Sequence, residues 1–524
     1  MMTSFESAFV LLFAIATGVA LLARRIRAPY TVALVLAGLA LGSFPTLSPP
    51  HLTKELMFGL FLPGLLFEAA FHIEYARFRR NLFMIVSLAV PGVALAIGVT
   101  SLVVTPLAGA FHLASGFGIK DALVFAALIA ATDPIAVVAM FKSVGAPKRL
   151  GVLIDAESLL NDGTAVVFFT IVMGLFSGHD TSISHAAVDF VKVVGMGVIA
   201  GALVAFLASA VMRFVDDAMI EITITTVAAY GSFSLAEQLH VSGVIATVTA
   251  GMILGNHARR ERMSPSTRVA IASFWEYVAF ALNSVVFLLI GFQVRMGELL
   301  ASWKIIIVAY LGVTVARAVV VAGVTAVFAR TRERIPWTWS VVLVWGGLRG
   351  ALSMVLVLST PPDHPYRQML VTMTYGVVLL SLLLQGLTIS PLLRRLGVAG
   401  TRGDREPYEL LYGRRRAAGS ALVALGEMLA KGQVNERVAA EVRADYEKTI
   451  ADTDAAIRDL HVEASALAEE EAIALRRSLL VVEKDAVLEA ERHGMVGESA
   501  GESLLRDIDA RTESVGGAAH DKDE

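Results

Sequence analysis

The sequence has no cysteine and little charge. Only 17% of its 524 residues are Asp, Glu, Lys or Arg, whereas 56% are hydrophobic and the mean hydropathy is +0.67. The lack of cysteine excludes disulfides, thiolate metal sites and cysteine nucleophiles. The scarcity of charge excludes an ordinary soluble enzyme, which needs a polar surface, and a disordered chain, which needs a high charge content. These exclusions indicate a membrane protein.

The charge is unevenly distributed along the chain. Residues 398–524 hold 17 basic and 27 acidic residues, whereas the longer stretch 1–397 holds only 27 basic and 20 acidic. This division predicts a transmembrane domain over residues 1–396 and a soluble, acidic, helical tail over residues 397–524. In the tail, the composition predicts helices over Ala439 to Leu460 and Glu469 to Arg492 and disorder over Ser514 to Glu524.

Residues 1–397 contain thirteen apolar stretches near the length that a helix needs to cross a bilayer, each bounded by charges, Pro or Gly. They predict an all-α polytopic fold with about thirteen transmembrane helices. The stretches are 7–23, 28–44, 55–73, 82–109, 120–141, 150–176, 188–212, 219–238, 241–257, 271–293, 304–329, 337–359 and 368–393.

The basic residues of the connecting loops test this assignment. With an alternating topology, 19 Lys and Arg residues fall on one side of the membrane and 6 on the other. The positive-inside rule then places the N-terminus outside and the tail in the cytoplasm, as an odd number of spans requires. A miscounted pair of helices would preserve this pattern.

A few ionisable residues lie inside apolar stretches, where each is costly unless it faces a polar interior or a partner. They are therefore candidate functional residues rather than ordinary surface charges. These residues are Glu68, Asp133, Asp155, Glu157, Asp162, Arg317 and Arg349. Three histidines, His72, His240 and His257, lie near span ends and are expected to be interfacial side chains rather than pH sensors.

The fifth stretch contains Ala131-Thr132-Asp133-Pro134. Proline removes a backbone donor and disfavours helix at the preceding residue, so the helix should unwind near Thr132. Unwound backbone at membrane depth is tolerated where it lines a polar cavity, and its carbonyl groups can then bind ions. The alternative is a simple proline kink with Asp133 capping the second half-helix.

The twelfth stretch contains Gly346-Gly347-Leu348-Arg349-Gly350, which predicts a second interruption, beside a buried cation. The two interruptions are seven spans apart, and this odd offset gives them opposite orientations, as in transporters built from inverted repeats. The alternative is that the glycines only permit close helix packing.

The sixth stretch begins with Asp155-Ala156-Glu157-Ser158-Leu159-Leu160-Asn161-Asp162. Helical spacing places Glu157, Ser158, Asn161 and Asp162 on one face, which should meet the broken fifth helix. Carboxylate, hydroxyl and carbonyl oxygens suit a hard cation such as Na⁺. Asp162 is expected to carry either the cation or a proton, and Arg349 is expected to be the counter-charge to Glu157.

Together these residues resemble the NhaP and NHE branch of monovalent cation/proton antiporters, which have an NhaA-like fold with two broken, crossing helices. The matching segments lie in five of the predicted spans. They are Phe67-Glu68, Ala131-Thr132-Asp133-Pro134, Glu157-Ser158-Leu159-Leu160-Asn161-Asp162-Gly163, Asn283 to Gly291 and Gly346-Gly347-Leu348-Arg349-Gly350.

The resemblance implies a homodimer in the cell membrane in which a mobile core domain carries the ion by an elevator-like movement. It implies cation and proton binding by Asp162, Ser158, the main chain at Thr132, and Glu68 directly or through water. Asn161 and Asp133 would hold the crossing helices, and Glu157 and Arg349 would form a buried pair. The Asn161-Asp162 pair resembles that of the electroneutral members, which exchange one cation for one proton and serve pH and sodium homeostasis.

Several alternatives remain open at this point. The ligand set does not distinguish Na⁺ from K⁺ or Li⁺, so K⁺/H⁺ exchange is the alternative within transport. An intramembrane aspartyl protease using Asp133 and Asp162 is disfavoured, because no Gly-x-Gly-Asp pattern surrounds either aspartate. A membrane sensor that signals through the tail is also disfavoured, since the tail carries no recognisable signalling motif. No cofactor, nucleotide or nucleic-acid partner is expected, and ion gradients alone should drive transport.

Overall fold

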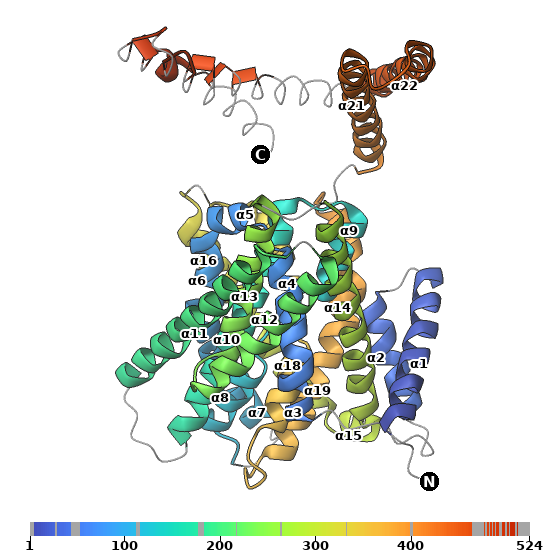
Figure 1. Ribbon diagram of the computed structural model, residues 1–524. Coiled ribbons are helices and arrows are strands. Elements are labelled where there is room, and N and C mark those ends of the chain that lie inside the picture. Colours follow the sequence, from blue (N-terminus) through green and yellow to red (C-terminus); the bar gives the residue numbers. More distant parts are fainter. Residues whose placement is uncertain are drawn as a thin grey trace. The chain divides into compact units, whose positions relative to one another are not determined.

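The computed structural model describes residues 5–26, 29–42, 53–111, 116–176, 183–215, 217–261, 265–331, 333–398, 402–463 and parts of 476–511. Every regular element in these residues is helical (Figure 1). The chain forms two compact units, Met1–Gly400 and Thr401–Glu524.

The first unit is built from α-helices and two short π-helical segments, η1 and η2. In chain order they are α1 (Phe5–Ile26), α2 (Tyr30–Gly42), α3 (Lys54–Leu56), η1 (Met57–Phe61), α4 (Leu62–His72), α5 (Tyr75–Arg80), α6 (Leu82–Ala89), α7 (Pro91–Ala110), α8 (Ile119–Leu128), α9 (Ile135–Val144), α10 (Lys148–Phe176), α11 (Ile183–Met212), α12 (Ala218–Gln238), α13 (Gly243–Glu261), α14 (Pro265–Gln293), α15 (Met296–Ala301), α16 (Trp303–Phe328), α17 (Trp337–Trp345), α18 (Ala351–Leu358), α19 (Arg367–Leu380), η2 (Ser381–Gln385) and α20 (Gly386–Arg395).

Each of the thirteen predicted stretches coincides with one helix or with two or three consecutive helical elements. Within the described residues, eight helical segments are long and apolar enough to cross a membrane, and three shorter apolar helices lie at Val10–Ala23, Tyr30–Gly42 and Gly243–Asn256. The remaining two stretches are the interrupted helices α8/α9 and α17/α18. The all-helical, polytopic fold is therefore confirmed, and the number of membrane crossings stays a prediction.

Both predicted interruptions are present. The chain is not helical from Ala130 to Pro134 or from Gly347 to Gly350, and the two unwound segments meet where the Asp133 amide donates a hydrogen bond to the Leu348 carbonyl at 2.8 Å. Because backbone groups cannot be left unpaired in hydrocarbon, each break supplies a partner for the other. The inverted-repeat relation between the two halves stays a prediction.

Glycines let several helices approach at backbone distance. A Cβ atom on Gly38 of α2 would overlap the Leu288 carbonyl oxygen of α14, and one on Gly291 of α14 would overlap the Val35 oxygen of α2. Gly255 of α13 faces the Phe71 oxygen of α4 in the same way. Small residues at helix contacts are typical of membrane proteins, where close packing replaces the hydrophobic driving force.

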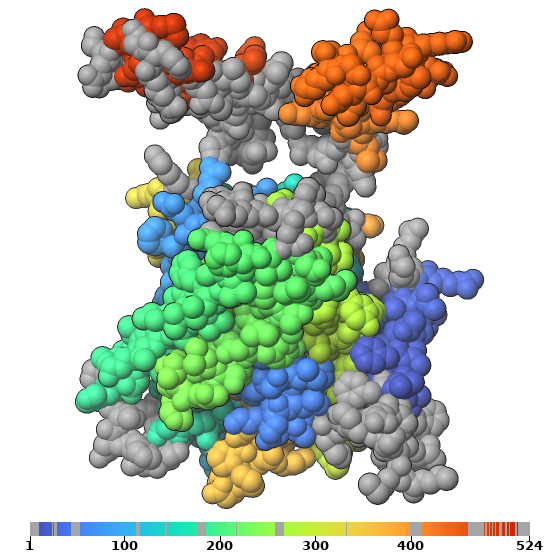
Figure 2. Space-filling model, viewed as in Figure 1, coloured from blue at the N-terminus to red at the C-terminus, as the bar shows by residue number. Residues whose placement is uncertain are grey.

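The outer surface is rich in apolar side chains. Figure 2 shows the face formed by α11, α12 and neighbouring helices. On α11, exposed side chains include Val191, Ile199, Leu203 and Phe206. An apolar surface of this extent fits contact with lipid rather than with water.

The second unit contains α21 (Arg402–Ala430) and α22 (Glu436–Glu463), which pack against each other. An ion pair joins Arg415 of α21 to Asp454 of α22 at 2.6 Å. The predicted helix from Ala439 to Leu460 is confirmed as part of α22. The predicted helix from Glu469 to Arg492 lies largely outside the described residues, and the stretch from Ser514 to Glu524 lies entirely outside them.

The close contact between α2 and α14 leads to a test of the packing. Gly291→Ala should destabilise the purified protein by about 1–3 kcal/mol, because its methyl group forces two backbones apart. Melting temperature in detergent measures this effect. Gly18→Ala and Gly323→Ala are matched controls, since a Cβ at either position meets nothing within 4 Å. Equal melting temperatures for all three variants would contradict the assigned contact.

Candidate ion-binding site

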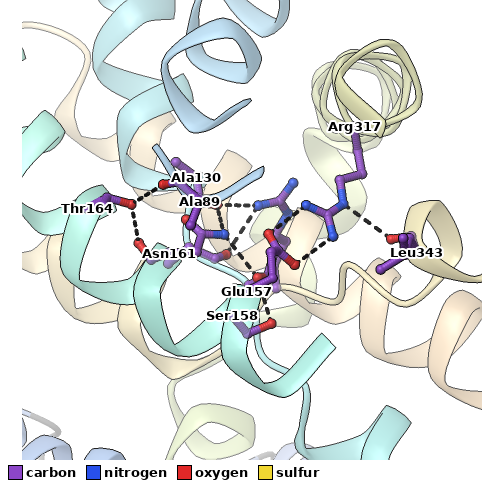
Figure 3. A network of polar contacts seen from close by, with 11 residues as sticks. Ala89, Ala130, Glu157, Ser158, Asn161, Thr164, Arg317 and Leu343 are labelled. Carbon is purple, nitrogen blue, oxygen red and sulfur yellow. Dashed lines mark hydrogen bonds and ion pairs between the residues drawn. The ribbon is translucent and has the colours of Figure 1, made fainter. Parts of the chain in front are cut away.

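The helix break at residues 130–134 packs against one face of α10. The Ser158 hydroxyl of α10 lies 3.0 Å from the Thr132 hydroxyl. One turn further along, the Asn161 amide group donates to the Ala130 carbonyl at 3.2 Å and to the Thr132 hydroxyl at 3.0 Å. Figure 3 shows Ser158 and Asn161 on the side of α10 that faces Ala130. The predicted contact between this face and the broken helix is therefore confirmed.

A cavity of about 110 Å³ lies beside the break. Its polar lining includes three residues that the sequence proposed as ligands, Glu68, Thr132 and Asp162. Ser158, the fourth, does not line the cavity and is 3% exposed, so it contacts this group only through the Thr132 hydroxyl. Asp155 and Asn283 also line the cavity, although the sequence argument assigned them no ligand role.

Asp162 faces this cavity without a polar protein partner. Among the described residues, no hydrogen bond or ion pair involves its side chain, although Asp133 and Glu157 act on it by charge repulsion. A carboxylate in this setting is disfavoured unless it binds a cation or a proton. The arrangement therefore suits a group that alternates between the two.

Asp133 lines the same cavity, but its carboxylate also has a structural contact. Its carboxylate accepts a hydrogen bond at 3.0 Å from the amide of Ile135, the first residue of α9. Gly350 packs against the same side chain so closely that a Cβ there would overlap the Asp133 carboxylate. The capping contact of the simple-kink alternative thus exists, but it accompanies an unwound segment of several residues.

The predicted pairing of Glu157 with Arg349 is wrong. Glu157, which is 1% exposed, instead accepts two hydrogen bonds of 2.8 Å from the guanidinium of Arg317 on α16 (Figure 3). The Arg317 Nε also donates to the Leu343 carbonyl at 3.2 Å. Gly347 leaves room for this arginine, since a Cβ there would lie 3.0 Å from the Arg317 Nε.

Arg349 binds backbone rather than a carboxylate. Its Nη1 donates to the carbonyl oxygens of Ala130, at 2.6 Å, and Ala131, at 3.2 Å. These carbonyls belong to the opposite helix break, so the cation neutralises exposed backbone dipoles next to Thr132. The sequence identified both arginines as buried but could not assign their partners, because both occur in apolar stretches and only the fold sets their directions.

His72 also belongs to the surroundings of the cavity. Its Nδ1 lies 3.2 Å from the Glu68 carboxylate and 3.0 Å from the Glu68 carbonyl oxygen. The sequence could have predicted this contact, because residues four apart on one helix lie next to each other. Among the described residues, no group of three or more His, Cys, Asp or Glu side chains has a metal-binding arrangement. The cavity thus presents separate carboxylates together with hydroxyl and amide groups.

The ion pair gives a test that distinguishes the two arginines. Arg317→Met should lower the free energy of unfolding by about 3–5 kcal/mol, because it leaves Glu157 charged and buried without its partner. Adding Glu157→Gln should recover much of that loss. Arg295→Gln, which removes an exposed pair with Glu298, should have little effect. Chemical denaturation in detergent measures the free energy of unfolding of each variant. The assignment would be contradicted if Glu157→Gln restored the stability of Arg349→Met but not that of Arg317→Met.

Comparison with known proteins agrees with this geometry. The family model described as "Sodium/hydrogen exchanger, transmembrane" matches residues 10–395. The chain is 38% identical over 417 residues to the Na⁺/H⁺ antiporter ApNhaP of Aphanothece halophytica, covering 78% of each chain. It is 36% identical over 461 residues to the Na⁺/H⁺ antiporter NhaG of Bacillus atrophaeus, covering 85% of each. The solved structure of the sodium proton antiporter MjNhaP1 from Methanocaldococcus jannaschii has a similar fold, with a TM-score of 0.63 at 18% identity over 75% of this chain and 98% of that one. The chain therefore belongs to the sodium/hydrogen exchanger family of secondary transporters.

Proposed function

We propose that the protein exchanges Na⁺ for H⁺ across the cell membrane and that Asp162 carries both ions in turn. The observation that supports this most directly is the position of Asp162, which faces the cavity beside a helix break and has no hydrogen-bonding or ion-pairing partner among the described residues. The names of the relatives support Na⁺ as the cation. Nothing in the cavity favours K⁺, which is therefore an outcome of the test rather than a second proposal.

Competition at one carboxylate accounts for the coupling. When Asp162 binds Na⁺, its negative charge is neutralised and no proton is held; when the cation leaves, a proton neutralises the same charge. The unoccupied, charged carboxylate is the state that burial disfavours most, so movement of the empty carrier is disfavoured. Thr132 and Glu68, which share the cavity, would complete the oxygen shell directly or through water. Ser158 would contribute through its contact with Thr132.

The remaining contacts would make the site a rigid unit. Asn161 joins α10 to the first helix break, Asp133 and Arg349 join the two breaks to each other, and the Glu157–Arg317 pair joins α10 to α16. A rigid unit of this kind fits an elevator-type movement that exposes the cavity to each side in turn. We further propose a homodimer with the N-terminus outside and residues 397–524 in the cytoplasm as a regulatory tail, serving pH and sodium homeostasis.

Dequenching of a pH-sensitive dye in proteoliposomes tests the carrier role. Addition of Na⁺ should release protons from vesicles containing the wild-type protein, whereas Asp162→Asn should lose nearly all of this response, because the amide can neither ionise nor hold a proton in exchange. Glu276→Gln is the matched control, since it removes an exposed carboxylate of α14 outside the cavity. Li⁺, K⁺ and choline are tested in parallel.

Normal Na⁺ exchange by Asp162→Asn would overturn the mechanism. A response of the wild type to K⁺ alone would replace the Na⁺ assignment by K⁺/H⁺ exchange. No response to any cation from folded protein would require the same assay on a protein ending near residue 400, and continued silence would reject the antiporter function.

The stoichiometry has its own test. If one Na⁺ exchanges for one proton, no net charge crosses the membrane and the membrane potential does no work on the cycle. A Na⁺ concentration jump on a solid-supported membrane should then give no steady current, although the dye assay on the same preparation reports exchange. A sustained current that reverses with the Na⁺ gradient would show an electrogenic cycle.

A further inference from the structure

A second, much smaller cavity lies next to Arg349, on a set of residues that does not overlap with the lining of the ion cavity. Its volume is about 10 Å³. Its polar lining comes from Tyr310, Thr314 and Arg317 of α16, Arg349 of the helix break, and Ser381 and Gln385 of η2. The proposed ion exchange uses Arg317 and Arg349 as structural groups but assigns no role to the cavity between them.

Three buried polar atoms around this cavity make no hydrogen bond of ordinary geometry with the described residues, although the side chains of Thr314 and Gln385 lie close to the Tyr310 hydroxyl. They are the Arg349 Nε, the Gln385 Oε1 and the Tyr310 hydroxyl oxygen. Arg349 and Gln385 are each only 4% exposed. An unpaired buried polar group is destabilising, so three of them at one small cavity indicate a shared partner.

The backbone of η2 places two of the polar side chains at this cavity. The Ser381 hydroxyl accepts a hydrogen bond of 3.1 Å from the Arg349 amide and donates to the Val378 carbonyl at 2.9 Å. Gln385 lies at the other end of the same π-helical segment and lines the same cavity. Isolated π-helical turns in α-helices are frequent at functional sites. Here the π-turn brings Ser381 and Gln385 together beside the second helix break.

We propose that this cavity holds one buried water molecule bound by Arg349, Gln385 and Tyr310. Its volume matches the space that a single water needs, and buried waters typically make about three hydrogen bonds. The water would accept from the Arg349 Nε, donate to the Gln385 Oε1 and bond to the Tyr310 hydroxyl. A cation would be repelled by the guanidinium groups of Arg349 and Arg317. The charge of Arg317 is already neutralised by Glu157, and an anion would meet the carbonyl oxygen of Gln385 in a space of only about 10 Å³, so a water molecule fits best.

The water would make Tyr310 and Gln385 positioning residues for the ion site. The guanidinium of Arg349 binds the Ala130 and Ala131 carbonyls through its Nη1, and these precede Thr132 directly in the chain. Fixing the Nε side of the guanidinium therefore fixes the backbone at the cavity. This consequence rests on the proposed function, whereas the presence of the water does not.

Two near-isosteric variants test the proposal. Tyr310→Phe and Gln385→Met each remove one ligand of the water while keeping the volume, and each should raise the KM for Na⁺ by about threefold to tenfold with a smaller effect on the maximal rate. Because both act through one water, the double variant should raise the KM no more than the more severe single variant does. Thr374→Val is the matched control: its hydroxyl is also buried without a partner among the described residues, but it does not line the cavity.

A density map at a resolution that shows ordered water is the second measurement. We expect a peak between Arg349, Gln385 and Tyr310 in the wild type and its loss in Gln385→Met. An empty cavity in the wild type, unchanged KM values in folded single variants, or fully additive effects in the double variant would each overturn the proposal. If the wild type exchanges no cation, the proposed function fails, and the density map still decides whether the water exists.

Discussion

The structure depends on one constraint, which is that two unwound stretches of backbone must satisfy each other in a low-dielectric interior. The Asp133 amide donates to the Leu348 carbonyl across the crossing, and Arg349 from the second break donates to the Ala130 and Ala131 carbonyls of the first. In water these groups would be solvated and the breaks would need no partners. In hydrocarbon each break requires the other, so the crossing forms as a unit or not at all.

The charges around the crossing have separate tasks. Glu157 and Arg317 are fully engaged with each other at two hydrogen bonds of 2.8 Å, which makes their charges structural. Asp162 lies further along α10, faces the cavity and has no such partner among the described residues. The ion pair between Glu157 and Arg317 therefore gives the protein a rigid frame. The carboxylate of Asp162 remains able to exchange its ion. Pairing Asp162 with an arginine would abolish the exchange, because the permanent cation would compete with Na⁺ and the proton.

Much of this arrangement was predictable from local sequence. Pro134 and the glycines at 346, 347 and 350 predict both breaks, because proline and glycine weaken a helix through their local effect on the backbone. The facing of Ser158 and Asn161 toward the first break followed from helical spacing alone. The sequence analysis is wrong about the partner of Arg349. It pairs this arginine with Glu157 because both are charged residues in apolar stretches. Its partners are carbonyl groups, which every residue has and which no sequence pattern distinguishes.

The sequence by itself determined the fold class, the positions of the helices, the two breaks and the burial of Glu157, Arg317 and Arg349, because each follows from local hydropathy and backbone chemistry. Only the tertiary structure decided that Arg317 pairs with Glu157, that Arg349 binds backbone, that Ser158 lies behind Thr132, and that His72 contacts Glu68. These outcomes depend on the direction and distance of side chains from helices far apart in the chain. Hydropathy fixes which residues are buried, but only packing fixes which of them meet.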